Sequence, residues 1–306
     1  MKGKKRKLNI GRCLLWSMSF FIFLGVLLTV FICLSGRVGR EETIPADMLC
    51  FLAQSVSDGK ILDENAKILK KVQEENALKQ ARIAQIQTEW ETLPAGTILQ
   101  PEEMDKNQLD KYFAAYEISN TVYERIVGKS FQEGTEVGLD DLRYMKVLHY
   151  NFEHELQVGE LIVAAVLQED FRNIFMELFE AEYEIQSMYL ADDYWTGDPT
   201  TTDSASIEEN NTSAFLYRPA TGSSKLSRHA YGMAIDINPQ QNPYVSYRTG
   251  EAVWDHANAD DYIDRTTGLP HMITHDDICY RIFEKYGFVW GGDWEYIKDY
   301  QHFEKG

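Results

Sequence analysis

Two short segments near the C-terminus hold residues suited to binding a metal ion. Residues 227–238 read SRHAYGMAIDIN and contain His229 and Asp236, and residues 299–304 read DYQHFE and contain His302. Zinc accepts imidazole nitrogen and carboxylate oxygen at about 2.0–2.2 Å, and three protein ligands leave one position for a water nucleophile. The sequence therefore predicts a hydrolytic Zn²⁺ site formed by His229, Asp236 and His302.

The local pattern indicates how the first two ligands reach one point. In a strand at residues 234–237, alternation places Asp236 on one face and the flanking isoleucines on the other, which would be the core face. Gly232 lies between His229 and this strand, and glycine permits a turn that other residues resist. We expect the turn to bring the imidazole beside the carboxylate.

Four further residues are candidates for catalysis or substrate binding. Asp299 precedes His302 by three residues, which suits a general base beside the nucleophilic water and a later proton donor to the departing amine. Arg218 could supply positive charge to a developing oxyanion or to a substrate carboxylate, although an arginine in an acid-rich chain often forms only a surface ion pair. Ser227 and Trp294 are the remaining candidates for contacts with substrate.

These residues resemble a family of bacterial and phage enzymes, the zinc D-alanyl-D-alanine carboxypeptidases and L-alanyl-D-glutamate endopeptidases, with the vancomycin-resistance D,D-dipeptidases as relatives. The family pattern S-x-H-x-x-G-x-A-x-D is met from Ser227 to Asp236, and its later E/D-x-x-H is met from Asp299 to His302. The resemblance covers residues 140–306, and residues 238–244 and 287–294 look like the endopeptidase branch.

The resemblance implies zinc held by His229, Asp236 and His302, with Asp299 as the catalytic base. It also matches Arg218 to the family's Tyr-Arg-Pro arginine near the scissile carbonyl. The family often has glutamate where this chain has Asp299, which leaves open whether a terminal D-Ala is removed or a bond after L-Ala is cut. The implied substrate is a stem peptide of peptidoglycan.

The N-terminus predicts a membrane anchor. Residues 13–34 form 22 consecutive positions without a charge, enough for a helix to cross a bilayer core of about 30 Å. Basic residues precede this run and place the N-terminus in the cytoplasm, and no small-x-small cleavage signal follows it. We therefore expect a single-pass protein of the bacterial, Gram-positive cell membrane with its catalytic domain outside the cell.

Three regions follow from this organisation: residues 1–40 as basic tip and anchor, residues 41–134 as a helical stalk and accessory region, and residues 135–306 as the zinc peptidase domain. The stalk is expected over 61–90, where a heptad frame places apolar residues at a and d positions: Leu62, Leu69, Val72, Ile83, Ile86 and Trp90. Polar residues interrupt this seam, so the sequence leaves open whether the stalk forms a homodimer.

The peptidase domain is predicted to be α+β, with a small antiparallel sheet and flanking helices around the zinc site. The expected elements are a helix at 101–127, strands at 144–150 and 160–163, a helix at 164–183, a strand at 184–190, a loop at 196–211, and strands at 234–237 and 302–304.

Charge and other residue types narrow the function. Residues 41–306 hold 22 basic and 48 acidic residues, a formal charge of −26, which argues against a nucleic-acid partner. Only Cys50 and Cys279 lie outside the apolar run, so a metal must rely on histidine and carboxylate. His271 and His275 are four residues apart but follow Pro270 and lack the glutamate of a metalloprotease helix, so we expect them not to be ligands.

Two other classes of function compete with the peptidase. A non-haem iron oxygenase also uses two histidines and a carboxylate, but usually places the acid two residues after the first histidine in a double-stranded β-helix, whereas the gap here is seven. A membrane-anchored scaffold could bind cell-wall peptide without cleaving it. Because all four core site residues are present, the sequence favours the peptidase.

Overall fold

The computed structural model describes residues 59–306, with side chains described from residue 66 onward. The predicted anchor at 13–34 and the basic tip lie outside the described residues. Among residues 59–306, no helix is long and apolar enough to cross a bilayer.

The predicted stalk is a helix, α3 (Gly59–Glu89). Its final part does not present a free heptad seam, because Ile83 and Ile86 are buried. Trp90, which begins the 3₁₀ turn after α3, is buried as well, and Ile86 and Trp90 join the main hydrophobic core. Trp90 packs edge-on against Tyr112 with ring centroids 5.1 Å apart. The apolar pattern near the end of α3 is therefore explained by contacts within the chain, and the sequence leaves open whether the earlier part of the helix forms a homodimer.

A four-stranded antiparallel sheet follows, in the order β1-β4-β3-β2. Its strands are β1 (Ile98–Leu99), β2 (Phe113–Tyr116), β3 (Leu142–Tyr150) and β4 (Leu156–Ala164). The two central strands confirm the predicted strands at 144–150 and 160–163. Because β1 and β2 precede residue 135, the sheet crosses the expected start of the peptidase domain, and independent folding of residues 135–306 stays a prediction.

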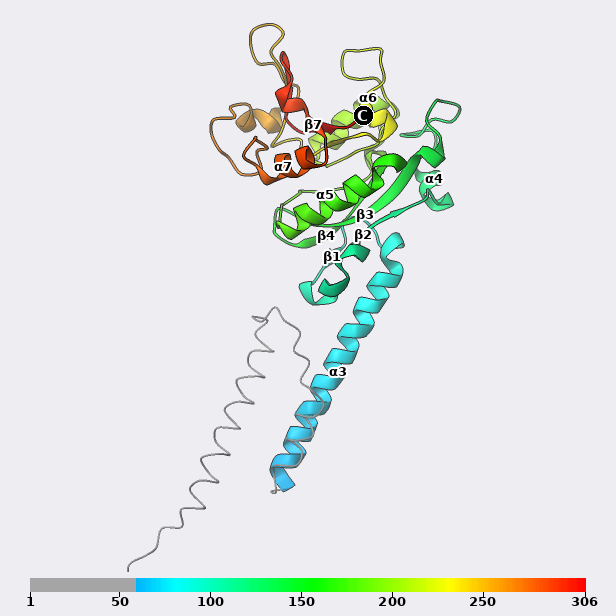
Figure 1. Cartoon of the computed structure of the whole chain (residues 1–306), viewed down its shortest axis with the longest axis vertical. Coiled ribbons are helices and arrows are strands. Elements are labelled where there is room, and N and C mark those ends of the chain that lie inside the picture. The colour runs from blue at the N-terminus through cyan, green and yellow to red at the C-terminus, as the bar shows by residue number, and fades with distance from the viewer. Residues whose placement is uncertain (1–58) are drawn as a thin grey trace, which may run out of the picture. The chain divides into compact units, whose positions relative to one another are not determined.

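Helix α5 (Gln168–Glu180) joins the sheet to the C-terminal region, as Figure 1 shows. It packs on β2, β3 and β4 and also on α7 (Ile278–Lys285). Its apolar face, Phe171, Ile174, Phe175 and Leu178, is almost fully buried in the core that also holds Phe283 of α7. The helix predicted at 164–183 is confirmed in this shorter form, and it anchors the C-terminal region to the sheet.

The C-terminal region contains two small antiparallel sheets. One has the order β5-β9-β7, formed by β5 (Ala234–Asp236), β9 (His302–Glu304) and β7 (Val289–Trp290). The other pairs β6 (Tyr244–Ser246) with β8 (Ile297–Asp299). The protein is thus α+β with small antiparallel sheets, as predicted, and the sheets of the described region do not form the double-stranded β-helix that the oxygenase alternative required.

Three predicted elements differ from the structure. The helix predicted at 101–127 is instead two 3₁₀ segments (Pro101–Glu103 and Lys106–Tyr112), strand β2 and the short helix α4 (Asn120–Ile126). Pairing of β2 with β3 overrides the helical spacing of its apolar residues. The predicted strand at 184–190 makes only isolated bridges, through Glu184 and Ser187.

The loop predicted at 196–211 contains helix α6 (Pro199–Glu208). Two features favour a helix start here. The Asp198 side chain accepts hydrogen bonds from the backbone N–H groups of Thr200 and Thr201, and Pro199 occupies the first turn. Residues of low helix propensity are tolerated because Thr202 and Ser206 are buried and hydrogen-bonded.

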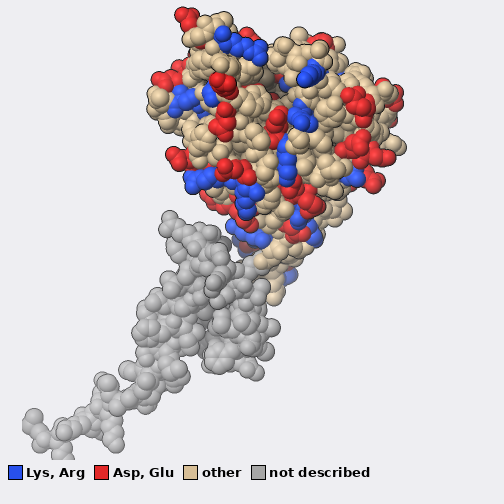
Figure 2. Space-filling model, turned by 45° about the horizontal axis from the view of Figure 1, so that its top comes forward, with Lys and Arg blue, Asp and Glu red and all other residues tan. Residues whose placement is uncertain are grey.

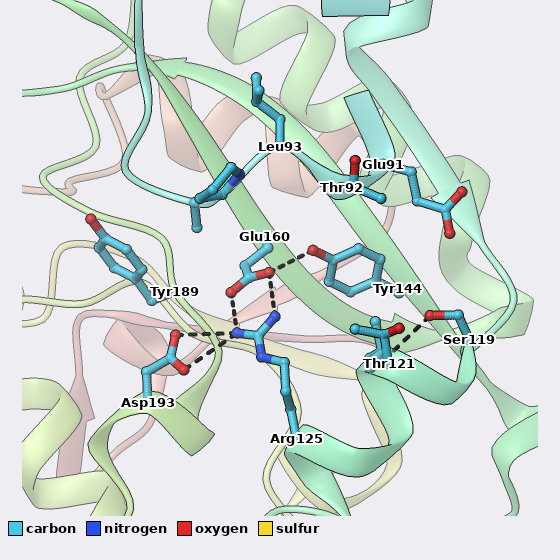
Figure 3. A pocket seen from close by; sticks show the side chains of 13 residues that line it. Glu91, Thr92, Leu93, Ser119, Thr121, Arg125, Tyr144, Glu160, Tyr189 and Asp193 are labelled. Atoms are coloured by element: carbon cyan, nitrogen blue, oxygen red, sulfur yellow. Dashed lines mark hydrogen bonds and ion pairs between the residues drawn. The ribbon is translucent and has the colours of Figure 1, made fainter. Parts of the chain in front are cut away.

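A partly buried ionic cluster lies between the sheet and α4, in a pocket of about 490 Å³ (Figure 3). Arg125 of α4 donates to both carboxylate oxygens of Glu160, at 2.6 and 3.0 Å, and also to Asp193. The Tyr144 hydroxyl donates to Glu160 at 2.5 Å, and Lys146 is the cross-strand neighbour of Glu160. Burial lowers the pKa of Lys146 to about 8. Since Arg125, Tyr144 and Glu160 satisfy one another, the cluster has a structural role, holding α4 to the sheet.

Acidic and basic side chains are interspersed on the face of the described residues seen in Figure 2. The acidic excess of the chain is therefore not gathered into a region of one sign on this face.

The ionic cluster yields a stability prediction. Glu160→Gln removes the charge that compensates Arg125 and Lys146, so we expect a loss of about 3 kcal/mol in the free energy of unfolding. The matched control is Asp193→Asn, because the Asp193 side chain is 43% exposed and its ion pair at 3.3 Å should contribute less than about 1 kcal/mol. Urea unfolding of the full chain measures both, and equal effects of the two substitutions would contradict the structural role of Glu160.

Candidate metal centre and catalytic pocket

Strand pairing brings two of the predicted ligands together. β5 and β9 are antiparallel, and Asp236 is the cross-strand partner of His302. As alternation predicts, Ile235 and Ile237 are fully buried while the Asp236 carboxylate faces His302, with Oδ1 3.0 Å from Nδ1. Two predicted ligands from segments 66 residues apart thus lie side by side on adjacent strands of a small sheet.

A tight turn supplies the third ligand. His229 lies in a 3₁₀ turn (Arg228–Tyr231) capped by Ser227, whose hydroxyl accepts from the backbone N–H of His229, and ended by Gly232 with φ of +65°. A Cβ at Gly232 would lie 2.6 Å from the backbone nitrogen of Ala164, at the end of β4. Glycine is therefore required here for its backbone conformation, as the sequence predicts, and also for its lack of a side chain, which the structure adds.

The three candidate ligand atoms form a small triangle. His229 Nε2 lies 3.1 Å from His302 Nδ1 and 3.3 Å from Asp236 Oδ2. The other carboxylate oxygen, Asp236 Oδ1, lies 3.0 Å from His302 Nδ1. Ligands at about 2.0–2.1 Å from a tetrahedral Zn²⁺ are separated from one another by about 3.3 Å. All three residues are buried, and they form the only such group of His, Cys, Asp and Glu within residues 59–306. The donor set fits a zinc ion.

Neighbouring groups orient both imidazoles. His229 Nδ1 lies 2.5 Å from the Ala214 carbonyl oxygen and donates to it, which leaves Nε2 as the coordinating atom. His302 Nε2 lies 3.1 Å from Glu304, so Nδ1 faces the centre. These outward hydrogen bonds select the tautomers that metal binding needs.

Without a metal, a proton on His302 balances Asp236. Burial disfavours the charged imidazole, but hydrogen bonds to Asp236 and Glu304 outweigh it and raise the pKa of His302 to about 10. Burial also opposes ionisation of Asp236, yet the adjacent His229 and His302 hold its pKa far below the ordinary value. Metal binding must displace this proton, so metal affinity falls as the pH falls.

Asp299 lies beside the triangle with a free oxygen. It ends β8, and residues 300 and 301 connect it to His302. Its Oδ1 is buried and has no hydrogen-bond partner. Burial, followed by the charge of Asp236, raises the pKa of Asp299 to about 7, the range expected of a general base.

Arg218 is buried beside the same centre, with a relative exposure of 7%, and is not a surface ion pair. Its Nη2 lies 2.7 Å from Asp203 Oδ2, its Nη1 donates to the Pro219 carbonyl, and its Nε has no partner. Burial disfavours its charge, but the carboxylates of Asp203 and Asp236 more than compensate and raise its pKa.

One pocket of about 520 Å³ joins these residues. Ser227 lines it, although its hydroxyl oxygen already caps the turn that carries His229. Trp294 lines it too, with its ring 5.3 Å from the ring of His302. The structure therefore places every predicted site residue in this pocket, while their roles in binding and catalysis stay predictions.

Sequence reasoning missed two acidic residues of this site, Asp203 and Glu304. Asp203 lies in the segment predicted as a loop, and nothing in its sequence neighbourhood points to Arg218. Glu304 could have been found, because residues i and i+2 of a strand share a face, which places its carboxylate beside His302. His271 and His275 lie outside the triangle, and each is near an acidic side chain instead: Glu184 and Asp293.

The comparisons with known proteins agree with this geometry. Residues 221–305 match the family model described as D-alanyl-D-alanine carboxypeptidase, which confirms the resemblance seen in the sequence. The match supports a metallopeptidase of this general type. Arg218 and all of α6 lie outside the matched range, because they precede residue 221. No curated protein and no solved structure matches the chain significantly.

Gly291 packs against the turn that joins Asp299 to His302, and this contact yields a prediction. A Cβ at Gly291 would lie 2.6 Å from the Asp299 carbonyl oxygen and 3.2 Å from the His302 Cβ, so Gly291→Ala should displace the 299–302 turn. We expect zinc affinity to weaken by about tenfold or more, measured by competition with a chromophoric chelator. Gly138→Ala is the control, because its nearest side-chain atom lies 3.4 Å away. Unchanged affinity in Gly291→Ala would show that the turn position does not matter.

Proposed function

We propose that the protein is a membrane-anchored zinc peptidase that hydrolyses a peptide bond in the stem peptides of bacterial peptidoglycan. The observation that carries this proposal is the convergence of His229, Asp236 and His302 within one pocket, beside the unpaired carboxylate oxygen of Asp299. The family match of residues 221–305 supports the same reaction class.

His229 Nε2, Asp236 and His302 Nδ1 would hold the zinc. The ion supplies Lewis acidity and makes a water molecule nucleophilic at neutral pH. Ala214 and Glu304 keep the two imidazoles in the required orientation.

Asp299 would transfer the proton during hydrolysis. As a carboxylate it accepts a proton from the attacking water, whose oxygen forms the new bond to the carbonyl carbon. As a carboxylic acid it then gives that proton to the amine that leaves when the C–N bond breaks. Arg218, with its buried free Nε–H, would donate to the carbonyl oxygen as negative charge develops there.

The proposed location follows from the sequence of residues 1–40. A single membrane-spanning helix with its basic flank in the cytoplasm would place residues 59–306 outside the cell, within reach of wall close to the membrane. The proposed partners are thus the membrane and a stem peptide.

Incubation of the full chain, purified in detergent, with stem tetrapeptides and pentapeptides tests the proposal. We expect cleavage that chelation abolishes and added Zn²⁺ restores, detected by mass spectrometry. Loss of one D-Ala would identify a carboxypeptidase, and cleavage after L-Ala an endopeptidase. His302→Ala should be inactive. Peptide binding without any cleavage by the zinc-loaded chain would contradict the proposal and favour the scaffold alternative.

The pKa of Asp299 predicts the pH dependence of hydrolysis. Only the carboxylate accepts a proton, so kcat/KM should rise with pH and reach half its maximum at or below about 7, since a bound cation lowers the pKa of a nearby carboxyl group. Asp299→Asn should lose activity at every pH, whereas Asp293→Asn, which alters an exposed acid paired with His275, should retain the wild-type profile. A kcat/KM that falls between pH 5 and 7 would contradict this role.

A further inference from the structure

Helix α6 forms one wall of the catalytic pocket. Four of its residues line the pocket: Thr200, Asp203, Ser204 and Ile207. The helix lies outside the matched family region, so the family assignment gives these residues no role.

Asp203 is the acidic residue of α6 that contacts the predicted catalytic machinery. Its Oδ2 lies 2.7 Å from Nη2 of Arg218, and both side chains are largely buried, at 19% and 8% exposure. A pair this short and this shielded holds a guanidinium in one orientation far more strongly than a surface ion pair does.

The rest of the Arg218 environment leaves its orientation to Asp203. The backbone carbonyl of Arg218 accepts from the N–H of Ser227, which fixes the main chain next to the turn that carries His229. Beyond Cβ, the other polar contact of the side chain is the Pro219 carbonyl at 3.2 Å, and Nε has no partner. The carboxylates of Asp236 and Asp299 also attract the charge of Arg218. Without Asp203, either of them would be an alternative partner for the guanidinium.

Helix α6 is itself held rigidly. Thr202, next to Asp203, is fully buried and accepts a hydrogen bond from the backbone N–H of Thr196. Ser206, one turn later, accepts from the side chain of Asn211. The carboxylate of Asp203 thus projects from a fixed element toward Arg218.

We propose that Asp203 is a positioning residue for catalysis: it holds the Arg218 guanidinium toward the scissile carbonyl and keeps it from pairing with Asp236 or Asp299. This inference rests on the proposed peptidase function. It assigns to α6, which the family match does not include, a part in transition-state stabilisation that acts through Arg218.

A double-mutant cycle on stem-peptide hydrolysis tests the proposal. We expect Arg218→Ala to lower kcat/KM by about 100- to 1000-fold, as loss of an oxyanion donor does, and Asp203→Ala to lower it by about 10- to 100-fold through kcat, with KM nearly unchanged. Because Asp203 acts through Arg218, the double variant should be no worse than Arg218→Ala within about twofold.

The control breaks an ion pair of the same length elsewhere. Glu177 and Lys285 are 2.7 Å apart on α5 and α7, and Glu177→Gln should leave kcat/KM unchanged. Asp203→Glu, which keeps the charge, should recover part of the activity lost in Asp203→Ala. Thermal unfolding of each variant identifies any loss that comes from misfolding.

The outcomes separate the two proposals. Multiplicative losses in the double variant of an active enzyme, or wild-type kcat in a folded Asp203→Ala, would overturn the positioning role and leave the peptidase function standing. A zinc-loaded wild-type chain that cleaves no stem peptide would overturn the peptidase function, and the positioning role with it.

A second measurement uses ¹⁵N-labelled arginine. The Arg218 side-chain resonances should show hindered rotation in the wild-type protein and faster rotation in Asp203→Asn. Equal rotation in both proteins would overturn the proposal.

Discussion

The pairing of β5 with β9 is the constraint on which the site depends. It places Asp236 directly opposite His302, and the turn that ends at Gly232 adds His229 to the same point. One nitrogen of each imidazole and the oxygens of the Asp236 carboxylate then face one another at distances of 3.0–3.3 Å. Positive charge at the centre favours this arrangement: the surrounding carboxylates raise the pKa of His302, and a zinc ion would supply the charge in the proposed enzyme.

The surroundings preserve this geometry from several directions. The Ala214 carbonyl and the Glu304 carboxylate bind the outer nitrogen of each imidazole. Close packing at Gly232 and Gly291 leaves no space for a side chain behind either ligand turn. Through α5, the small sheets share one hydrophobic core with the four-stranded sheet, so residues far from the candidate zinc ligands contribute to their position.

The sequence predicted the metal site better than its supporting structure, for physical reasons. His229 and Asp236 lie in one short pattern and Asp299 and His302 in another, and the resemblance to a known family implies that the two patterns meet. Asp203 reaches the site only through tertiary packing of α6, a helix that its composition disfavours and that its cap and buried hydroxyls sustain. The sequence predicts helix where β2 lies, because local periodicity carries no information about a pairing partner some 30 residues later in the chain.

The central claim is that these three side chains coordinate zinc, and X-ray absorption at the zinc edge of the full chain tests it most directly. The account predicts nitrogen and oxygen ligands at about 2.0–2.2 Å, with the scattering signature of two imidazoles, and loss of one imidazole in His229→Ala. A first shell containing sulfur at about 2.3 Å, or one without imidazole, would contradict it.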